Sequence, residues 1–225
     1  MSCRSADLQV RSCHRVDEED ADLEVRAPAS HLIGTGSSDP WLERWLPLIG
    51  ERASSRPILE IGCGGGRDTE VLAGAGHRVV AIDLSPAAIV RARARVPHAE
   101  FHCQDIRAPF PVDAAGVVLA SLSLHYFPWP ETETLVGRIR SLLRPAGLLL
   151  CRLNSTNDHN FGASGHPQID DNFYLVDGAP KRFFDRAAVD RLFSSGWRVL
   201  GAEERTIDRY ERPKSAWEVI LEKSP

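Results

Sequence analysis

The fold is decided by one stretch of the chain, Pro57-Ile58-Leu59-Glu60-Ile61-Gly62-Cys63-Gly64-Gly65-Gly66-Arg67-Asp68-Thr69. An apolar run ends in a segment, residues 62–66, in which four of five residues are glycine, and a polar segment follows. Because glycine lacks a Cβ atom, the backbone there can turn tightly and approach a ligand closely. Amide groups at the start of a following helix are then available to a negative group. The stretch predicts a strand, a ligand-binding loop and a helix in succession.

Strands and helices alternate beyond this stretch. Further apolar runs predict strands at 78–82, 100–103, 115–120, 147–151, 197–200 and 216–221. The segments between them predict helices at 67–73, 85–96, 135–143 and from about 185. Near-continuous apolar strands are typical of a parallel sheet covered on both faces. The last two strands are too close in sequence for a helical crossover, so we expect an antiparallel hairpin. The predicted fold is α/β, Rossmann-like and doubly wound, with a mostly parallel seven-stranded sheet.

The chain divides into an arm and one domain. Residues 1–40 are polar or rich in Ala, Pro, Gly and Ser, which predicts a flexible arm and linker. An apolar helical stripe begins at Trp41, so we expect the folded domain to span 41–225. Within it, residues 154–180 are rich in Asn, Asp, His and Gly. A loop of this length predicts a lid over the substrate.

Composition excludes several classes of partner. The net charge of -4 and the pI of about 6.1 offer no attraction for nucleic acid. No stretch is long and apolar enough for a membrane span or a signal peptide. The five cysteines form no CxxC pair, which suits a reducing compartment, and Cys63, Cys103 and Cys151 are expected to be buried. We expect a cytoplasmic monomer or homodimer without membrane partners.

Two acidic residues follow predicted strands. Asp83 comes 21 residues after Gly62, where a carboxylate can accept hydrogen bonds from both hydroxyls of a ribose. Asp105 follows the third strand and can accept from an adenine amino group, while Ile106 covers the ring. Together with the glycine loop, these residues predict a nucleoside ligand.

The glycine pattern distinguishes between nucleosides. A dinucleotide fingerprint needs glycine where Arg67 and Thr69 stand, whereas Glu60 completes the pattern E-x-G-x-G-x-G. On these residues, 57–223 resembles the Rossmann-like (class I) S-adenosylmethionine-dependent methyltransferases, and 62–69 is similar to their small-molecule, tellurite-resistance-type branch. The resemblance implies that the loop holds the methionine end, Asp83 the ribose and Asp105 the adenine. The cofactor-binding residues implied are Glu60, Gly62, Cys63, Gly64, Gly66, Asp83, Leu84, Asp105, Ile106 and Ser121.

Candidate acceptor residues follow the fourth and fifth strands, which end beside the ligand crevice in such a fold. Methyl transfer depends mostly on alignment and on excluding water. His125, with a pKa expected near neutrality, is the candidate base, and Tyr126 adjoins it. The candidate substrate residues are Asn154, His159, Phe173 and Tyr174. No metal is expected, because the spacing of His159 and His166 fits no standard ligand pattern.

The leading hypothesis is a methyltransferase that uses S-adenosylmethionine to methylate a small molecule. Ala120-Ser121-Leu122-Ser123 stands where an Asn-Pro-Pro-Tyr motif marks amine methylation, which weakens a DNA or protein-glutamine target. One alternative is an NAD-dependent oxidoreductase, which Arg67 and Thr69 disfavour. The other is a non-catalytic nucleoside-binding protein, which would bind the cofactor without consuming it.

Overall fold

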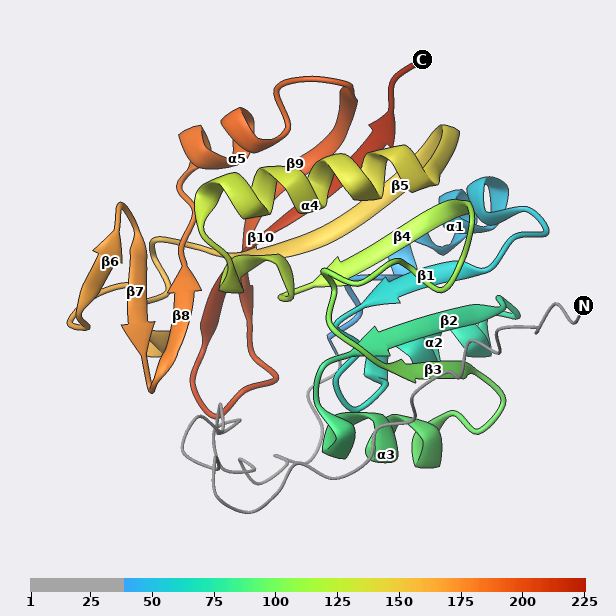
Figure 1. The fold of residues 1–225 in the computed structure, drawn as a ribbon, viewed down its shortest axis with the longest axis horizontal. Helices are drawn as coiled ribbons and strands as arrows, with labels where there is room; N and C mark the ends of the chain where they lie inside the picture. Colours follow the sequence, from blue (N-terminus) through green and yellow to red (C-terminus); the bar gives the residue numbers. More distant parts are fainter. Residues whose placement is uncertain (1–38) are drawn as a thin grey trace, which may run out of the picture.

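The computed structural model describes residues 39–225, and its centre is a seven-stranded sheet in the order β3-β2-β1-β4-β5-β10-β9 (Figure 1). The strands are β1 Ile58–Ile61, β2 Val79–Asp83, β3 Glu100–Cys103, β4 Ala115–Ser121, β5 Leu143–Asn154, β9 Trp197–Ile207 and β10 Lys214–Lys223. The first five are parallel, and β10 is antiparallel to both β5 and β9. The predicted α/β class, the seven-stranded sheet and the closing hairpin are therefore confirmed.

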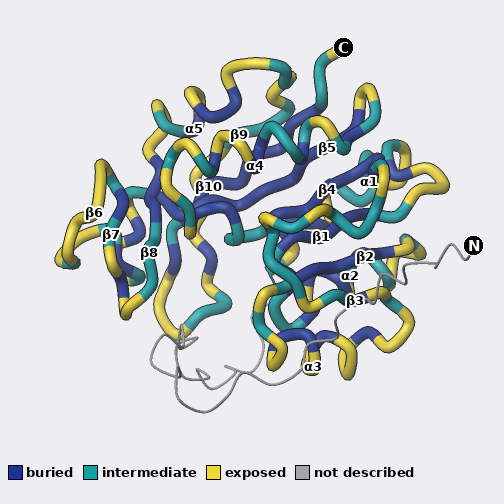
Figure 2. The backbone as a smooth tube through the Cα atoms, viewed as in Figure 1, coloured by how far each residue is buried: buried dark blue, intermediate teal, exposed yellow. Residues whose placement is uncertain are grey.

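Helices cover both faces of this sheet (Figure 1). One face is covered by α1 Leu46–Ala53, α2 Arg67–Gly74 and α3 Pro86–Arg95, and the other by α4 Trp129–Leu142 and α5 Arg186–Leu192. The central strands are buried along their length (Figure 2), as a sheet covered on both sides requires. Ser85, the predicted start of this helix, caps α3 just before Pro86, where its Oγ accepts a hydrogen bond from the N–H of Ala88 at 3.3 Å.

The edge strands differ from their predictions. β9 continues to Ile207, although the predicted strand ends at residue 200. The prediction was too short because the second half of β9 carries the exposed residues Glu203, Glu204 and Arg205 and therefore has no apolar run. At the other edge, the expectation that Cys103 is buried was wrong: it is the exposed last residue of the edge strand β3. Edge strands cover little core, so apolar periodicity describes them poorly.

A small antiparallel sheet occupies the second half of the segment predicted as a long loop. It consists of β6 Gln168–Asp170, β7 Phe173–Val176 and β8 Ala179–Arg182. Asp177 and Gly178 turn β7 into β8, with φ angles of 53° and 78°. The sheet lies on the side toward which β1, β2 and β4 point, and β8 contacts the short 3-10 helix η2, Leu124–Tyr126 (Figure 1). The segment predicted as a lid thus adjoins the candidate acceptor residues.

Most of the predicted arm, residues 1–38, lies outside the described residues. Asp39 is described and is ion-paired with Arg152 of β5. In the described part of the chain, none of the helices has both the length and the apolar character needed to cross a membrane. Nor do any three His, Cys, Asp or Glu side chains come together there in a group that could hold a metal ion.

Candidate active site

The glycine loop joins β1 to α2 at the carboxyl edge of the sheet. Gly62, Gly64 and Gly66 have φ angles of 74°, 53° and 78°, in the left-handed region that favours glycine. A Cβ on Gly62 would lie 2.5 Å from Ser123 Cβ, and one on Gly66 would lie 3.1 Å from Ala92 Cα. A Cβ on Gly64 would meet no atom within 4 Å. Packing therefore requires two of these glycines, whereas Gly64 leaves space for a ligand to reach the backbone.

Asp83 ends β2 directly beside this loop, as predicted. Its Oδ2 accepts a hydrogen bond from the N–H of Gly64 at 2.8 Å, and its Oδ1 accepts from the N–H of Ser85 at 2.8 Å. Each carboxylate oxygen retains further acceptor capacity, so the fixed group can also accept from two ligand hydroxyls. The neighbouring Leu84 is 64% exposed and adds apolar surface next to the carboxylate.

Glu60 and Cys63 are buried at the base of the loop. Glu60 is 2% exposed, and its Oε2 accepts a hydrogen bond from Thr69 Oγ1 at 2.5 Å. Burial raises the pKa of Glu60 well above its ordinary value, and the nearby charge of Asp68 raises this pKa further. Glu60 thus joins β1 to α2 beneath the loop, and its predicted contact with a cofactor stays a prediction.

The raised pKa of Glu60 makes folding stability depend on pH. Because the folded-state pKa exceeds the unfolded value, the stabilisation from this group is complete below the unfolded pKa and is lost as pH rises toward the folded pKa. Glu60→Gln keeps an acceptor for Thr69 and removes the charge. We expect the gain in unfolding free energy from this substitution to be larger at about pH 8 than at about pH 5. Urea denaturation at both pH values measures it, and an equal effect at both contradicts the raised pKa.

The predicted adenine residues lie in the loop after β3. Asp105 accepts hydrogen bonds from the backbone N–H of Arg107 at 2.8 Å and from its guanidinium at 2.6 to 3.0 Å. Hydrogen bonding to Arg107 lowers the pKa of Asp105. Ile106 packs against the core, and its carbonyl accepts from Arg138 at 3.1 Å. A ligand amino group has to share Asp105 with Arg107, so the adenine role stays a prediction.

The helix η2 carries His125 and Tyr126 beyond the end of β4. His125 is 3% exposed, and burial lowers its pKa well below the ordinary value, helped by the charges of Lys214 and Lys181. The expectation of a near-neutral pKa was wrong, because the sequence did not reveal this burial; the imidazole is neutral at physiological pH. Tyr126 stacks obliquely on His125, with ring centroids 4.1 Å apart, and is 42% exposed.

Several buried polar atoms at this edge have no hydrogen-bond partner among the described residues. They are Ser121 Oγ, Ser123 Oγ, His125 Nδ1 and Asn154 Oδ1. All four lie at or just beyond the carboxyl ends of β4 and β5. Buried polar groups in proteins are nearly always hydrogen-bonded. Four such atoms at one edge mark a place where water or a polar ligand can supply the partners.

The four predicted substrate residues do not all come together. Asn154 is buried at the end of β5, whereas His159 is exposed, with its Nδ1 3.5 Å from Ser164 Oγ. Phe173 is buried within the small sheet, where the Arg182 guanidinium lies 4.6 Å from its ring centroid. Tyr174 is half-buried. Asn154 and Tyr174 are therefore better placed to meet a ligand than His159 and Phe173.

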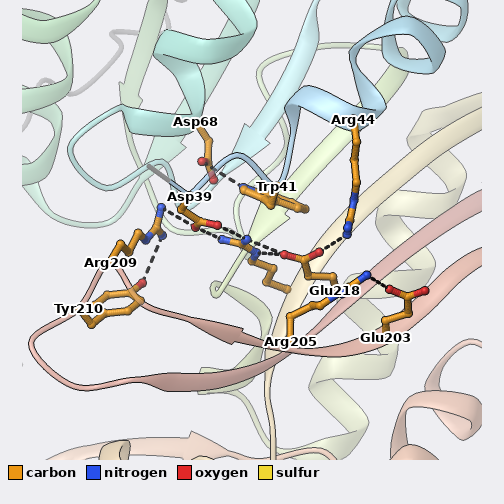
Figure 3. Close-up of polar contacts among 10 residues, drawn as sticks. Asp39, Trp41, Arg44, Asp68, Glu203, Arg205, Arg209, Tyr210 and Glu218 are labelled. Atoms are coloured by element: carbon orange, nitrogen blue, oxygen red, sulfur yellow. Dashed lines mark hydrogen bonds and ion pairs between the residues drawn. The ribbon is translucent and has the colours of Figure 1, made fainter. Parts of the chain in front are cut away.

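A buried ion-pair network behind this edge was missed by sequence reasoning (Figure 3). Arg152 is fully buried in β5 and donates to both carboxylate oxygens of Asp39, at 2.5 and 2.7 Å, and to Glu218 Oε1 of β10, at 2.6 and 3.1 Å. The Trp41 ring lies 4.3 Å from this guanidinium, and its Nε1 donates to Asp68 Oδ1 in α2 at 3.2 Å. The network ties the start of the domain to the helix that follows the glycine loop.

A second missed cluster lies beside η2. Lys214, the first residue of β10, pairs with Asp158 at 2.6 Å, and Lys181 of β8 lies close enough for its charge to act on both. The only hint of this cluster in the sequence was the rarity of lysine, because only three of the 27 basic residues are lysines.

Two hollows of the described surface lie away from the candidate site. One lies beside Phe110 and Arg138 and the other beneath α5, and neither is lined by a residue of the candidate site.

The central part of the chain is similar to known methyltransferases. Residues 58–147 match a protein-family model described as a methyltransferase domain. An S-adenosylmethionine-dependent methyltransferase from Mesorhizobium loti superposes with a TM-score of 0.62 over 83% of this chain and 99% of that one, at 21% identity. The fold is that of the class I methyltransferases. A 1,6-didemethyltoxoflavin-N1-methyltransferase from Burkholderia thailandensis gives a TM-score of 0.58 over 83% of this chain and 82% of that one, at 21% identity.

Curated relatives match over a shorter length. The trans-aconitate 2-methyltransferase of Delftia acidovorans is 36% identical over 106 residues, which are 45% of this chain and 39% of the relative. The chain thus covers well under two thirds of that relative. The family match contains the glycine loop, Asp83 and His125 but ends before Asn154 and the small sheet. The family match therefore spans all the predicted cofactor residues, whose individual roles stay predictions.

Proposed function

We propose that this chain is an S-adenosylmethionine-dependent methyltransferase that acts on a small-molecule acceptor. One observation carries the proposal: the N–H of Gly64, with open space over its Cα, donates to the carboxylate of Asp83 at the carboxyl edge of the sheet. Bare backbone beside a fixed carboxylate is the arrangement by which this architecture holds a nucleoside. The run 62–69 supports a finer assignment to the small-molecule, tellurite-resistance-type branch.

The residues at this edge fit the proposed cofactor. The glycine loop admits its amino-acid end, and Asp83 accepts hydrogen bonds from its ribose. Ser121 Oγ, buried without a partner among the described residues, offers a polar group at the end of β4. Leu84 offers exposed apolar surface for the base. When bound, S-adenosylmethionine supplies a methyl group already activated by a positively charged sulfur.

The chain's own residues then align the acceptor and exclude water. The glycine loop and Asp83 would hold the cofactor, which would supply its activated methyl group to a lone pair of the acceptor. The neutral imidazole of His125 can accept a proton from the acceptor, but its lowered pKa makes it a weak base. His125 therefore fits best as a hydrogen-bonding group that orients the acceptor.

The nicotinamide-dependent alternative has no support in the loop. Thr69 stands where a dinucleotide fingerprint needs glycine, and its buried hydroxyl donates to Glu60. Arg67, at the other required position, is the first residue of α2. The close approach of a pyrophosphate depends on glycine at such positions.

The proposed activity is tested by measuring the formation of S-adenosylhomocysteine from S-adenosylmethionine. The chain is incubated with a panel of small acceptors that includes trans-aconitate, for which the curated relatives are named. We expect acceptor-dependent product. Cofactor binding without turnover of any acceptor favours the nucleoside-binding alternative, whereas stabilisation by NAD but not by S-adenosylmethionine in a thermal-shift comparison favours an oxidoreductase.

Asp83→Ala is expected to weaken the affinity for S-adenosylhomocysteine at least about tenfold, or about 1.4 kcal/mol, because charged hydrogen bonds to the ribose are lost. Calorimetric titration measures this loss. Asp83→Asn keeps one acceptor oxygen and serves if the alanine variant unfolds. Asp190→Ala, an exposed carboxylate on α5, is the matched control and is expected to leave the affinity unchanged. Full affinity in folded Asp83 variants contradicts the assigned role.

A further inference from the structure

Lysine is rare in this chain, and its placement is uneven. Three of the 27 basic residues are lysines, and the rest are arginines. The charges of Lys181 and Lys214 both act on His125 of η2, whereas Lys223, the last residue of β10, donates to the Leu143 carbonyl at 2.6 Å. Apart from the contact of His102 with Glu100, arginine makes the other side-chain ion pairs of the described residues, but lysine offers a compact charge with three freely rotating donors.

Of the two ammonium groups, only that of Lys214 is paired with a buried carboxylate. Lys214 donates to Asp158 Oδ2 at 2.6 Å, and Oδ1 of this buried aspartate accepts from the N–H of Ser215 at 3.2 Å. Lys181 is half-buried and makes no hydrogen bond or ion pair with residues 39–225; the exposed Asp177 acts on it only from a distance. A charge withdrawn from water needs a partner. The cluster therefore holds one positive charge more than the buried carboxylate can pair.

Buried hydrogen-bonding groups face this surplus charge. β8 packs against η2, and the charges of Lys181 and Lys214 both act on the imidazole of His125. His125 is almost fully buried, and its Nδ1 has no partner among the described residues. Asn154 Oδ1, at the end of the adjoining β5, lacks a partner as well. A single positive charge and unpaired polar groups thus meet at the carboxyl edge, beyond β4 and β5.

We propose that Lys181, with Lys214 and His125 beside it, binds a carboxylate group of the methyl acceptor. The proposal rests on the proposed methyltransferase function and specifies the acceptor as an organic acid. A carboxylate supplies the partner that Lys181 lacks, through charge-assisted hydrogen bonds. The surplus is one charge, which matches a carboxylate better than a doubly charged phosphate. Because Lys181 belongs to the small sheet, the acid also ties this sheet to the main domain.

The inference comes from residues outside the family match. The match ends at residue 147, before β8 and before β10. The curated relative described above, which is named for a carboxylic acid, matches only 45% of this chain. The positive charge of Lys181, Lys214 and Asp158 taken together is thus an independent reason to expect that the methyl acceptor is an acid.

The test measures acid binding directly. The complex with S-adenosylhomocysteine is titrated calorimetrically with di- and tricarboxylic acids, including trans-aconitate, and with the fully methylated esters of the same acids. We expect at least one acid to bind about tenfold more tightly than its ester, the scale of one charge-assisted contact. Lys181→Met is expected to remove this preference, and Lys181→Arg to retain part of it. Lys223→Met is the matched control and keeps the full preference.

Stability and cofactor binding serve as internal controls. Lys181→Met removes a half-buried charge without an ion-pair partner among the described residues, so we expect its melting temperature to be equal to or above that of the unsubstituted chain. Its affinity for S-adenosylhomocysteine stays unchanged, because the glycine loop and Asp83 are intact. Acids that bind no more tightly than their esters, or a Lys181→Met variant that keeps the preference, overturn the proposal. The titration is repeated without S-adenosylhomocysteine, so that failure of the cofactor to bind is distinguished from failure of the acid site.

Discussion

Arg152→Met is expected to lower the free energy of unfolding by about 3 kcal/mol, the lower end of the range for breaking a buried ion pair. The substitution leaves Asp39 and Glu218 without the guanidinium that donates to both of them. Arg209, 3.3 Å from Asp39, and Arg44, which is ion-paired with Glu218, remain and limit the loss. Urea denaturation of the purified variant measures it.

A double variant separates two contributions to this loss of stability: a buried carboxylate left without its partner, and lost packing. Arg152→Met combined with Glu218→Leu removes the buried carboxylate along with its partner, and apolar replacement of a whole buried pair is often close to neutral. We expect the double variant to be at least about 1 kcal/mol more stable than Arg152→Met alone. The account is contradicted if the single variant loses less than about 1 kcal/mol, or if the double variant is less stable than the single one. Either result would mean that Arg152 does not neutralise the partly buried Asp39 and the buried Glu218.

Gly62→Ala is expected to cost about 2 to 5 kcal/mol of unfolding free energy. The residue has a φ of 74°, and the left-handed conformation costs a residue with a Cβ about 1 to 2 kcal/mol. The new methyl group would also lie 2.5 Å from Ser123 Cβ, and overpacking of this kind costs about 1 to 3 kcal/mol. Denaturation with urea reports the sum, and the displaced loop is expected to bind S-adenosylhomocysteine more weakly as well.

Gly76→Ala is the matched control for backbone strain. Gly76 has a φ of 86°, and a Cβ there would meet no atom within 4 Å. It should therefore cost only the conformational part, about 1 to 2 kcal/mol. If Gly62→Ala and Gly76→Ala lower the unfolding free energy equally, the close packing of the glycine loop against Ser123 contributes nothing to stability. Packing would then not require glycine at residue 62.

The cofactor half of the molecule was predictable because its determinants are local. The strand, glycines and helix start of residues 57–69 are contiguous, and each restricts the backbone on its own. Asp83 was found because it directly follows an apolar strand, and parallel strands place such ends at one edge. The position of Asp83 beside Gly64 follows from these short-range signals.

The acceptor side was less predictable because its elements are short and irregular. β6, β7 and β8 have three or four residues each, and β6 is exposed throughout. Such strands carry too few residues to show a period of two, and their stability depends on neighbours that the sequence does not identify. The low pKa of His125 has the same origin, since burial beneath a distant segment cannot be read from adjacent residues.

The ion-pair network was unpredictable for a different reason. Arg152 meets partners 66 and 113 positions away, and nothing in the local sequence of an apolar strand signals that its arginine points inward. The composition shows that lysine is rare, but it does not show that the charges of Lys181 and Lys214 both act on His125.

A crystal structure of the chain with S-adenosylhomocysteine tests the central claim most directly. The account predicts the ligand against residues 62–66, with its ribose hydroxyls donating to Asp83 and its sulfur directed toward Ser121 and η2. A structure in which the ligand binds elsewhere, or in which the chain's own side chains fill this edge, would contradict it.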